Sequence, residues 1–86
     1  MWTDVPNLRH LRAFVLVAEM GGVTRAAGRI HLSQPAITQA LAKLEERFAT
    51  KLLEFGADGM TLTTPGCLLR DRVERALGLI ETGARE

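Results

Sequence analysis

The sequence predicts a mainly α-helical fold: three short helices around one core, a two-stranded β-hairpin and a longer C-terminal helix. Two observations favour it. Apolar residues recur at intervals of three and four, the spacing of one helix face, before and after a glycine-bounded segment at 56–59. Short, partly alternating runs flank that segment on both sides, which is typical of a hairpin.

The composition is that of an ordinary folded domain. The 86 residues are 47% hydrophobic and 24% charged, which suits one small domain. No apolar run approaches the roughly 18 residues of a membrane span, and the N-terminus lacks a signal-peptide pattern. Residues 1–6 show no periodicity and are expected to be a loosely held leader. The single Cys67 cannot form an internal disulfide and fits a reducing cytoplasm.

The first helix is expected at residues 8–20. Asn7 can cap its N-terminus, because an asparagine side chain accepts a hydrogen bond from the first turn. Gly21 and Gly22 end it, since glycine readily takes the left-handed conformation that closes a helix. The residues expected on its buried face are Leu8, Leu11, Phe14, Val15 and Ala18.

The second and third helices are expected to form a helix-turn-helix. The second runs from Thr24 to about Ile30, and its Ala26 and Ala27 allow a tight crossing because their side chains are small. A turn at residues 31–33 follows. The third helix is capped by Ser33 or Gln34 and extends to Phe48, with proline acceptable in its first turn.

This third helix has two different faces. The apolar face is spaced 4, 3 and 4 along the chain and consists of Ile37, Leu41, Leu44 and Phe48. The opposite face holds Pro35, Gln39, Ala42 and Glu46, flanked by Thr38 and Lys43. A helix that enters the DNA major groove needs this division, because its first turns must approach base edges closely.

The hairpin is expected to form a wing behind this helix. Its strands are predicted at residues 51–55 and 60–63. Thr64 and Pro65 then serve as the N-cap and first residue of a last helix that runs towards Arg85. The fold is therefore a winged helix-turn-helix, with the DNA-binding domain at residues 1–64 and a linker and dimerisation helix at 65–86.

Charge is concentrated on the helix-turn-helix. Residues 8–51 carry seven cations and three acids, a balance of +4, whereas the remainder carries four cations and seven acids, a balance of −3. Phosphate binding requires such a distribution. No nucleophile–base pair, metal-ligand spacing or phosphate-cradling loop occurs, so we expect neither an enzyme nor a cofactor. Glu45 and Glu46 are expected to be a helix surface pair.

Several motifs resemble one known family. The run LRHLRAF at 8–14, TRAA at 24–27, LSQPA at 32–36 and LEE at 44–46 are similar to the N-terminal domain of LysR-type transcriptional regulators. LTTPG at 62–66 lies where that family turns from its wing into a linker helix. The resemblance implies binding to double-stranded DNA as a homodimer. It also implies that a small-molecule effector binds only through a C-terminal domain outside these residues.

The candidate site residues follow from the helix faces and the resemblance together. Gln34 and Gln39 suit the adenine edge, because an amide donates and accepts together. The full base-reading set is Gln34, Pro35, Ala36, Thr38 and Gln39, where the proline and alanine offer apolar contact to thymine methyl groups. The set assigned to phosphates is Thr24, Arg25, Arg29, Ser33 and Lys43.

The last helix carries an apolar stripe that is longer than one small domain needs. The resemblance implies that it pairs with a second subunit, through an interface of Leu69, Val73, Ala76, Leu77 and Ile80. Two alternatives stay open: the helix folds back on its own domain, or the chain is a helical protein-interaction module.

Two residues depart from the family pattern. Many relatives have arginine at the positions of Gln39 and Phe55. The loop after Phe55 carries Asp58 and no cation, so the wing is the less secure DNA contact, and Phe55 can pack inward instead.

Overall fold

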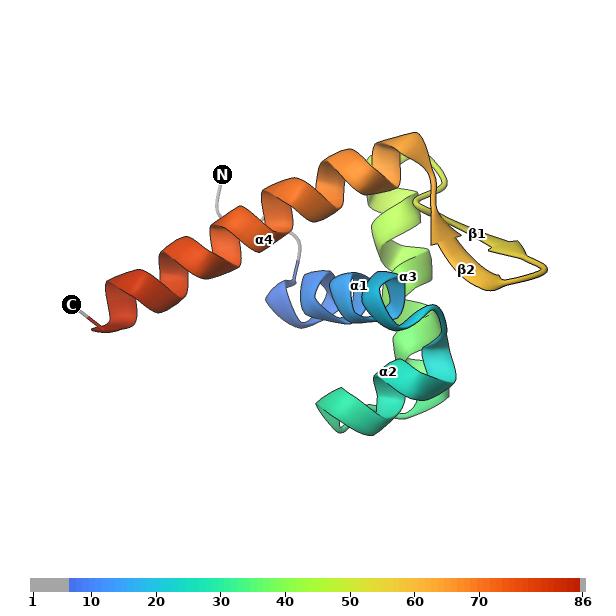
Figure 1. Cartoon of the computed structure of the whole chain (residues 1–86), viewed down its shortest axis with the longest axis horizontal. Helices are drawn as coiled ribbons and strands as arrows, with labels where there is room; N and C mark the ends of the chain where they lie inside the picture. Colours follow the sequence, from blue (N-terminus) through green and yellow to red (C-terminus); the bar gives the residue numbers. More distant parts are fainter. Residues whose placement is uncertain (1–6, 86) are drawn as a thin grey trace.

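The computed structural model describes residues 7–85, and the expected leader at residues 1–6 lies outside them. Figure 1 shows three short helices, a hairpin that projects from them, and a long last helix. The elements are α1 (Leu8–Met20), α2 (Val23–Ile30), α3 (Gln34–Phe48), β1 (Leu53–Gly56), β2 (Gly59–Leu62) and α4 (Thr64–Arg85). The predicted mainly α, winged helix-turn-helix fold is confirmed.

Helix α1 is the centre of the domain, because α2, α3 and α4 all pack against it. The Asn7 side chain accepts a hydrogen bond from the Arg9 N–H at 2.8 Å, and Gly21 ends the helix at φ 76°, as expected. The buried face differs from the prediction. Ala13, Phe14, Val15 and Val17 are buried, Leu11 and Ala18 are half-buried, and Leu8 is exposed. With neighbours on several sides, α1 buries a wider face than one stripe.

The helix-turn-helix forms between α2 and α3. Ala26 is completely buried, whereas Ala27 is half-buried at the same crossing. His31 ends α2 in the left-handed conformation, with φ 55°. Ser33 then caps α3, since its hydroxyl accepts a hydrogen bond from the Ala36 N–H at 3.2 Å. The expected turn and cap are therefore present.

The rear of α3 anchors it in the core. Ile37, Leu41 and Leu44 are buried as predicted, together with Ala40. The prediction for Phe48 is wrong, because this last residue of the helix is 40% exposed.

The hairpin is attached to the turn between α1 and α2. Gly59, with φ +102°, lies so close that a β-carbon there would be 2.7 Å from the Gly21 carbonyl oxygen. The next residue, Met60, donates its N–H to that same oxygen at 3.1 Å. Only glycine therefore fits at position 59, and the turn end of the hairpin, where Gly56 pairs with Gly59, has a defined position beside the helix-turn-helix.

Helix α4 begins one residue earlier than predicted. Thr63, not Thr64, is the cap, because its hydroxyl accepts a hydrogen bond from the Gly66 N–H at 3.0 Å. Gly66 packs against the Leu52 carbonyl, where a β-carbon would clash. From there α4 runs back along α1 and extends beyond it (Figure 1). None of the helices in residues 7–85 is both long and apolar enough to cross a membrane.

Candidate nucleic-acid interface

The N-terminal half of α3 presents one open face. Gln34, Pro35, Thr38 and Gln39 are exposed there, and Ala36 is half-buried. The opposite side is held in the core by buried aliphatic residues. The structure therefore places the five predicted base-reading residues at the exposed end of a firmly anchored helix.

The predicted phosphate-binding residues surround that end. Thr24, Arg25 and Arg29 are exposed on α2, Ser33 is exposed in the turn, and Lys43 is exposed further along α3. Ion pairs in the described part of the chain join Lys51 to Glu45 and Arg70 to Asp71, so the predicted cations remain available for phosphates. The Ser33 hydroxyl already accepts one hydrogen bond as a helix cap and can still donate another.

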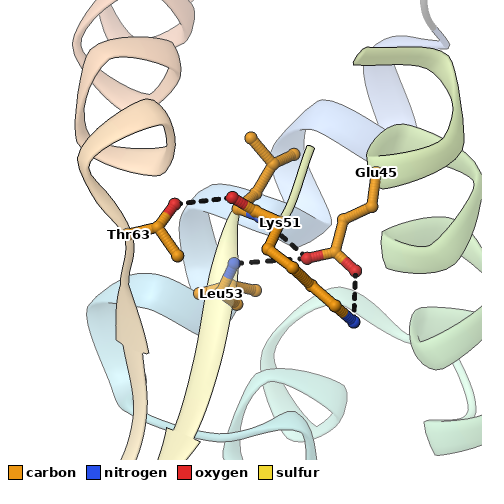
Figure 2. A network of polar contacts seen from close by, with 5 residues as sticks. Glu45, Lys51, Leu53 and Thr63 are labelled. Carbon is orange, nitrogen blue, oxygen red and sulfur yellow. Dashed lines mark hydrogen bonds and ion pairs between the residues drawn. The ribbon is translucent and has the colours of Figure 1, made fainter. Parts of the chain in front are cut away.

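A polar network fixes the orientation of α3 relative to the wing and α4 (Figure 2). One oxygen of the Glu45 carboxylate accepts hydrogen bonds from the backbone N–H groups of Leu52 and Leu53, at 2.8 and 3.3 Å. The other lies 3.6 Å from the Lys51 ammonium. Thr63, just before α4, donates its hydroxyl to the Lys51 carbonyl at 2.7 Å. The half-buried Glu45 carboxylate thus joins α3 to the start of the wing, and Thr63 joins that same segment to α4.

Sequence reasoning missed this role, since it treated Glu45 and Glu46 alike as a surface pair. Only Glu46 is exposed. Helical spacing could have separated the two. Glu45 lies four residues after the buried Leu41 and so flanks the apolar face, whereas Glu46 lies on the opposite face.

The wing is exposed and carries no cation. Phe55 is 84% exposed, so the expectation that it packs inward is wrong. It stands two residues after the buried Leu53 and opposite Met60, next to the turn end of the hairpin. Phe55 instead lines a groove shared with Arg25 of α2 and Thr38 of α3. The charged residues of the wing are Glu54 and Asp58.

The predicted dimer residues of α4 fall into two groups that differ in burial. Val73 is only 4% exposed and belongs to the core of its own domain, with Leu69 and Leu77 packed against it. The part of α4 from Leu69 to Leu77 therefore folds back on its own domain, as one of the alternatives above expected. Val73 is not available to a partner. Ala76 and Ile80 are exposed. The C-terminal half also exposes Leu79, by 74%, beside Ile80 at 52%.

The comparison with known proteins decides the family. Residues 8–67 match the family described as bacterial regulatory helix-turn-helix protein, lysR family. The chain belongs to the LysR family. This assignment confirms the resemblance noted in the motifs, and it disfavours the alternative of a helical protein-interaction module.

Two relatives illustrate the LysR-family similarity. The chain is 44% identical over 78 residues to the HTH-type transcriptional regulator GalR of Pseudomonas putida, which covers 91% of this chain and 20% of GalR. It is 40% identical over 79 residues to the HTH-type transcriptional regulator TfdT of Cupriavidus pinatubonensis, covering 92% of this chain and 35% of TfdT. The chain thus spans about a fifth to a third of these relatives. Their names agree with the expectation that it is not an enzyme.

Solved structures of LysR-family domains share the fold. The chain is similar to CbnR_DBD in a complex with DNA, with a TM-score of 0.83, 38% identity and 92% of each chain covered. It is also similar to BenM_DBD in a complex with catB site 1 DNA, with a TM-score of 0.87 and 30% identity. That match covers 92% of this chain and 88% of the other.

Proposed function

We propose that this chain is the sequence-specific DNA-binding domain of a LysR-type transcription regulator, with α3 as the recognition helix in the major groove. One observation carries the proposal: the exposed N-terminal half of α3 gathers small, amide and hydroxyl side chains on a helix whose rear is buried. Such a surface can approach base edges closely without disturbing the core. The DNA complexes of the similar CbnR_DBD and BenM_DBD support this function.

Base reading is assigned to five residues of α3. Gln34 and Gln39 can each form paired hydrogen bonds with an adenine, because an amide offers one donor and one acceptor side by side. Thr38 supplies a hydroxyl between them. Pro35 and Ala36 bring apolar surface to thymine methyl groups.

Phosphate binding is assigned to the residues around that helix. Arg25 and Arg29 lie one turn apart on α2 and can contact the same DNA strand. Thr24, Ser33 and Lys43 complete the set. These contacts hold the helix in register and carry no sequence information of their own.

The proposed dimer would form through α4. We assign the partner contact to a second copy of the chain, through the exposed C-terminal half that carries Ala76, Leu79 and Ile80. Adjacent exposed apolar side chains on a helix that extends beyond its own domain offer a surface suited to association with a second copy. A dimer would present two recognition helices to half-sites roughly 34–36 Å apart, or a multiple of that distance. We place the regulator in the bacterial cytoplasm, on the nucleoid.

Binding to random-sequence duplexes over a salt series tests the function. Affinity must fall steeply as salt rises, because each phosphate contact releases a counterion. Selection of bound duplexes followed by sequencing should then yield a preferred half-site. Binding that is absent at low salt, or that is independent of salt, would contradict the proposal and favour a protein-interaction module.

A further inference from the structure

A second basic surface lies beside the helix-turn-helix. A groove of about 450 Å³ runs between α1 and the end of α2, and its lining residues are Arg9, Arg12, Arg29, Ile30, His31 and Leu32. The two aliphatic residues are half-buried, whereas the three arginines and the histidine are exposed. Within the described part of the chain, no acidic side chain lines this groove. It is therefore an apolar depression surrounded by cationic groups.

None of the three arginines forms an ion pair within residues 7–85. The two ion pairs found there involve Lys51 and Arg70, neither of which lines the groove. Arg9 and Arg12 lie on one side of α1, three residues apart, and Arg29 approaches from α2. Guanidinium groups gathered in this way repel one another and attract an anion, and their planar donors suit phosphate oxygens.

The groove is continuous with the surface assigned to DNA. His31 and Leu32 lead directly into Ser33 and Gln34, the first residues of the recognition helix. Arg29 belongs to both surfaces, since it lines the groove and lies one turn from Arg25 on α2. A polyanion held by α2 and α3 therefore passes beside this groove.

We propose that Arg9, Arg12 and Arg29 form a second phosphate-binding site, which holds the DNA backbone flanking the base pairs that α3 reads. The inference rests on the proposed function and adds to it, because Arg9 and Arg12 have no role in the helix-turn-helix itself. The site extends the footprint on DNA without reading sequence. It also contributes its own share of the salt dependence.

Two duplexes separate this site from the recognition helix. The short one contains only a selected half-site, and the long one extends it by about one helical turn, ~10 base pairs, on each side. The 86-residue chain should bind the long duplex more tightly than the short one. Arg9→Ala/Arg12→Ala should lose about ten-fold in affinity on the long duplex at low salt, with its salt slope reduced by about 1.8. On the short duplex the same variant should match the unmodified chain.

Three controls keep the result interpretable. Arg47→Ala removes an exposed arginine from the far end of α3 and should leave both affinities unchanged. Arg9→Lys/Arg12→Lys should keep most of the salt slope, because the slope counts charges. Circular dichroism melting should show an intact fold for each variant, since both arginines are exposed.

The outcomes distinguish the site from the function on which it rests. The site would be overturned if the double alanine variant bound both duplexes with the same affinity as the unmodified chain. It would also be overturned if the variant lost the same affinity on the short duplex as on the long one. In either case the unmodified chain still binds DNA, and the proposed function stands. Failure of the unmodified chain to bind either duplex would overturn the function and the site together.

Discussion

Two residues of α3 have different surroundings. Gln39 is exposed on the outward face, whereas Glu45 turns back and accepts hydrogen bonds from the backbone that leads into the wing. The first residue is available to a ligand, and the second is already occupied by the protein. Substitutions at these two positions should therefore change different properties.

Replacement of Gln39 tests base reading. Gln39→Ala removes an amide without weakening the helix, because alanine has the higher helix propensity. We expect a loss of about 1–3 kcal/mol on the selected site and relaxed preference at one base pair, measured on matched and mismatched duplexes. Arg29→Ala should weaken binding to all sequences alike. A uniform loss for Gln39→Ala, with base preference retained, would contradict the assigned orientation of α3.

Replacement of Glu45 tests the network at the end of α3. Glu45→Ala leaves two part-buried N–H groups without their acceptor and should reduce the free energy of unfolding by about 1–3 kcal/mol in urea denaturation. Glu46→Ala is the matched control, since Glu46 is exposed, and should stay within about 0.5 kcal/mol. Equal, small effects of both substitutions would show that the network does not stabilise the fold.

The wing is the element that departs furthest from the expected DNA-binding chemistry. Its turn end is held against the turn between α1 and α2 through Gly21 and Gly59. The hairpin also exposes Phe55 and carries acidic residues where phosphate contacts would need cations. A wing in this position can lie near DNA, yet its own charges oppose the approach.

A cation in the wing should therefore strengthen binding. Asp58→Arg replaces a repulsive charge with an attractive one, so affinity should rise for all sequences, with a salt slope steeper by about one contact. Fluorescence anisotropy on specific and random duplexes would measure it. Glu74→Arg, an equal charge change on exposed α4, controls for net charge and should have little effect. No difference between the two variants would place the wing away from DNA.

At the scale of the whole molecule, α4 has one half that packs on the domain and one half that extends beyond it. Its first half belongs to the core through Val73, and its second half extends past α1 with Leu79 and Ile80 exposed (Figure 1). Because Leu79 and Ile80 lie outside the core, substitutions there test dimer formation without changing the stability of the fold. Charges placed there should disturb a dimer and leave the domain intact.

Ile80→Glu with Leu79→Glu tests the proposed dimer. We expect a lower mass in sedimentation experiments and much weaker binding to an inverted repeat, with binding to one half-site nearly unchanged. The thermal melting transition should stay intact, because both side chains are exposed. Leu77→Glu is the contrasting variant, since Leu77 packs against the core and its substitution should destabilise the fold. Equal losses on both DNA targets would count against α4 as the interface.

Local patterns in the sequence determined the helices and the open face of α3. Asn7, Gly21 and Ser33 act within a few residues of their own positions, so their capping roles could be predicted directly. Helical periodicity likewise places Gln34, Thr38 and Gln39 away from the buried aliphatic residues. These predictions hold because they depend on one segment at a time.

Only the tertiary structure decided which faces meet another segment. The periodicity of α1 could not reveal that three helices pack around it, and the stripe on α4 could not separate buried Val73 from exposed Ile80. The partner of Glu45 lies in a different element, as does the arginine that joins Arg9 and Arg12 in one groove. Such contacts depend on where distant segments come together in space, and spacing along one helix carries no information about that.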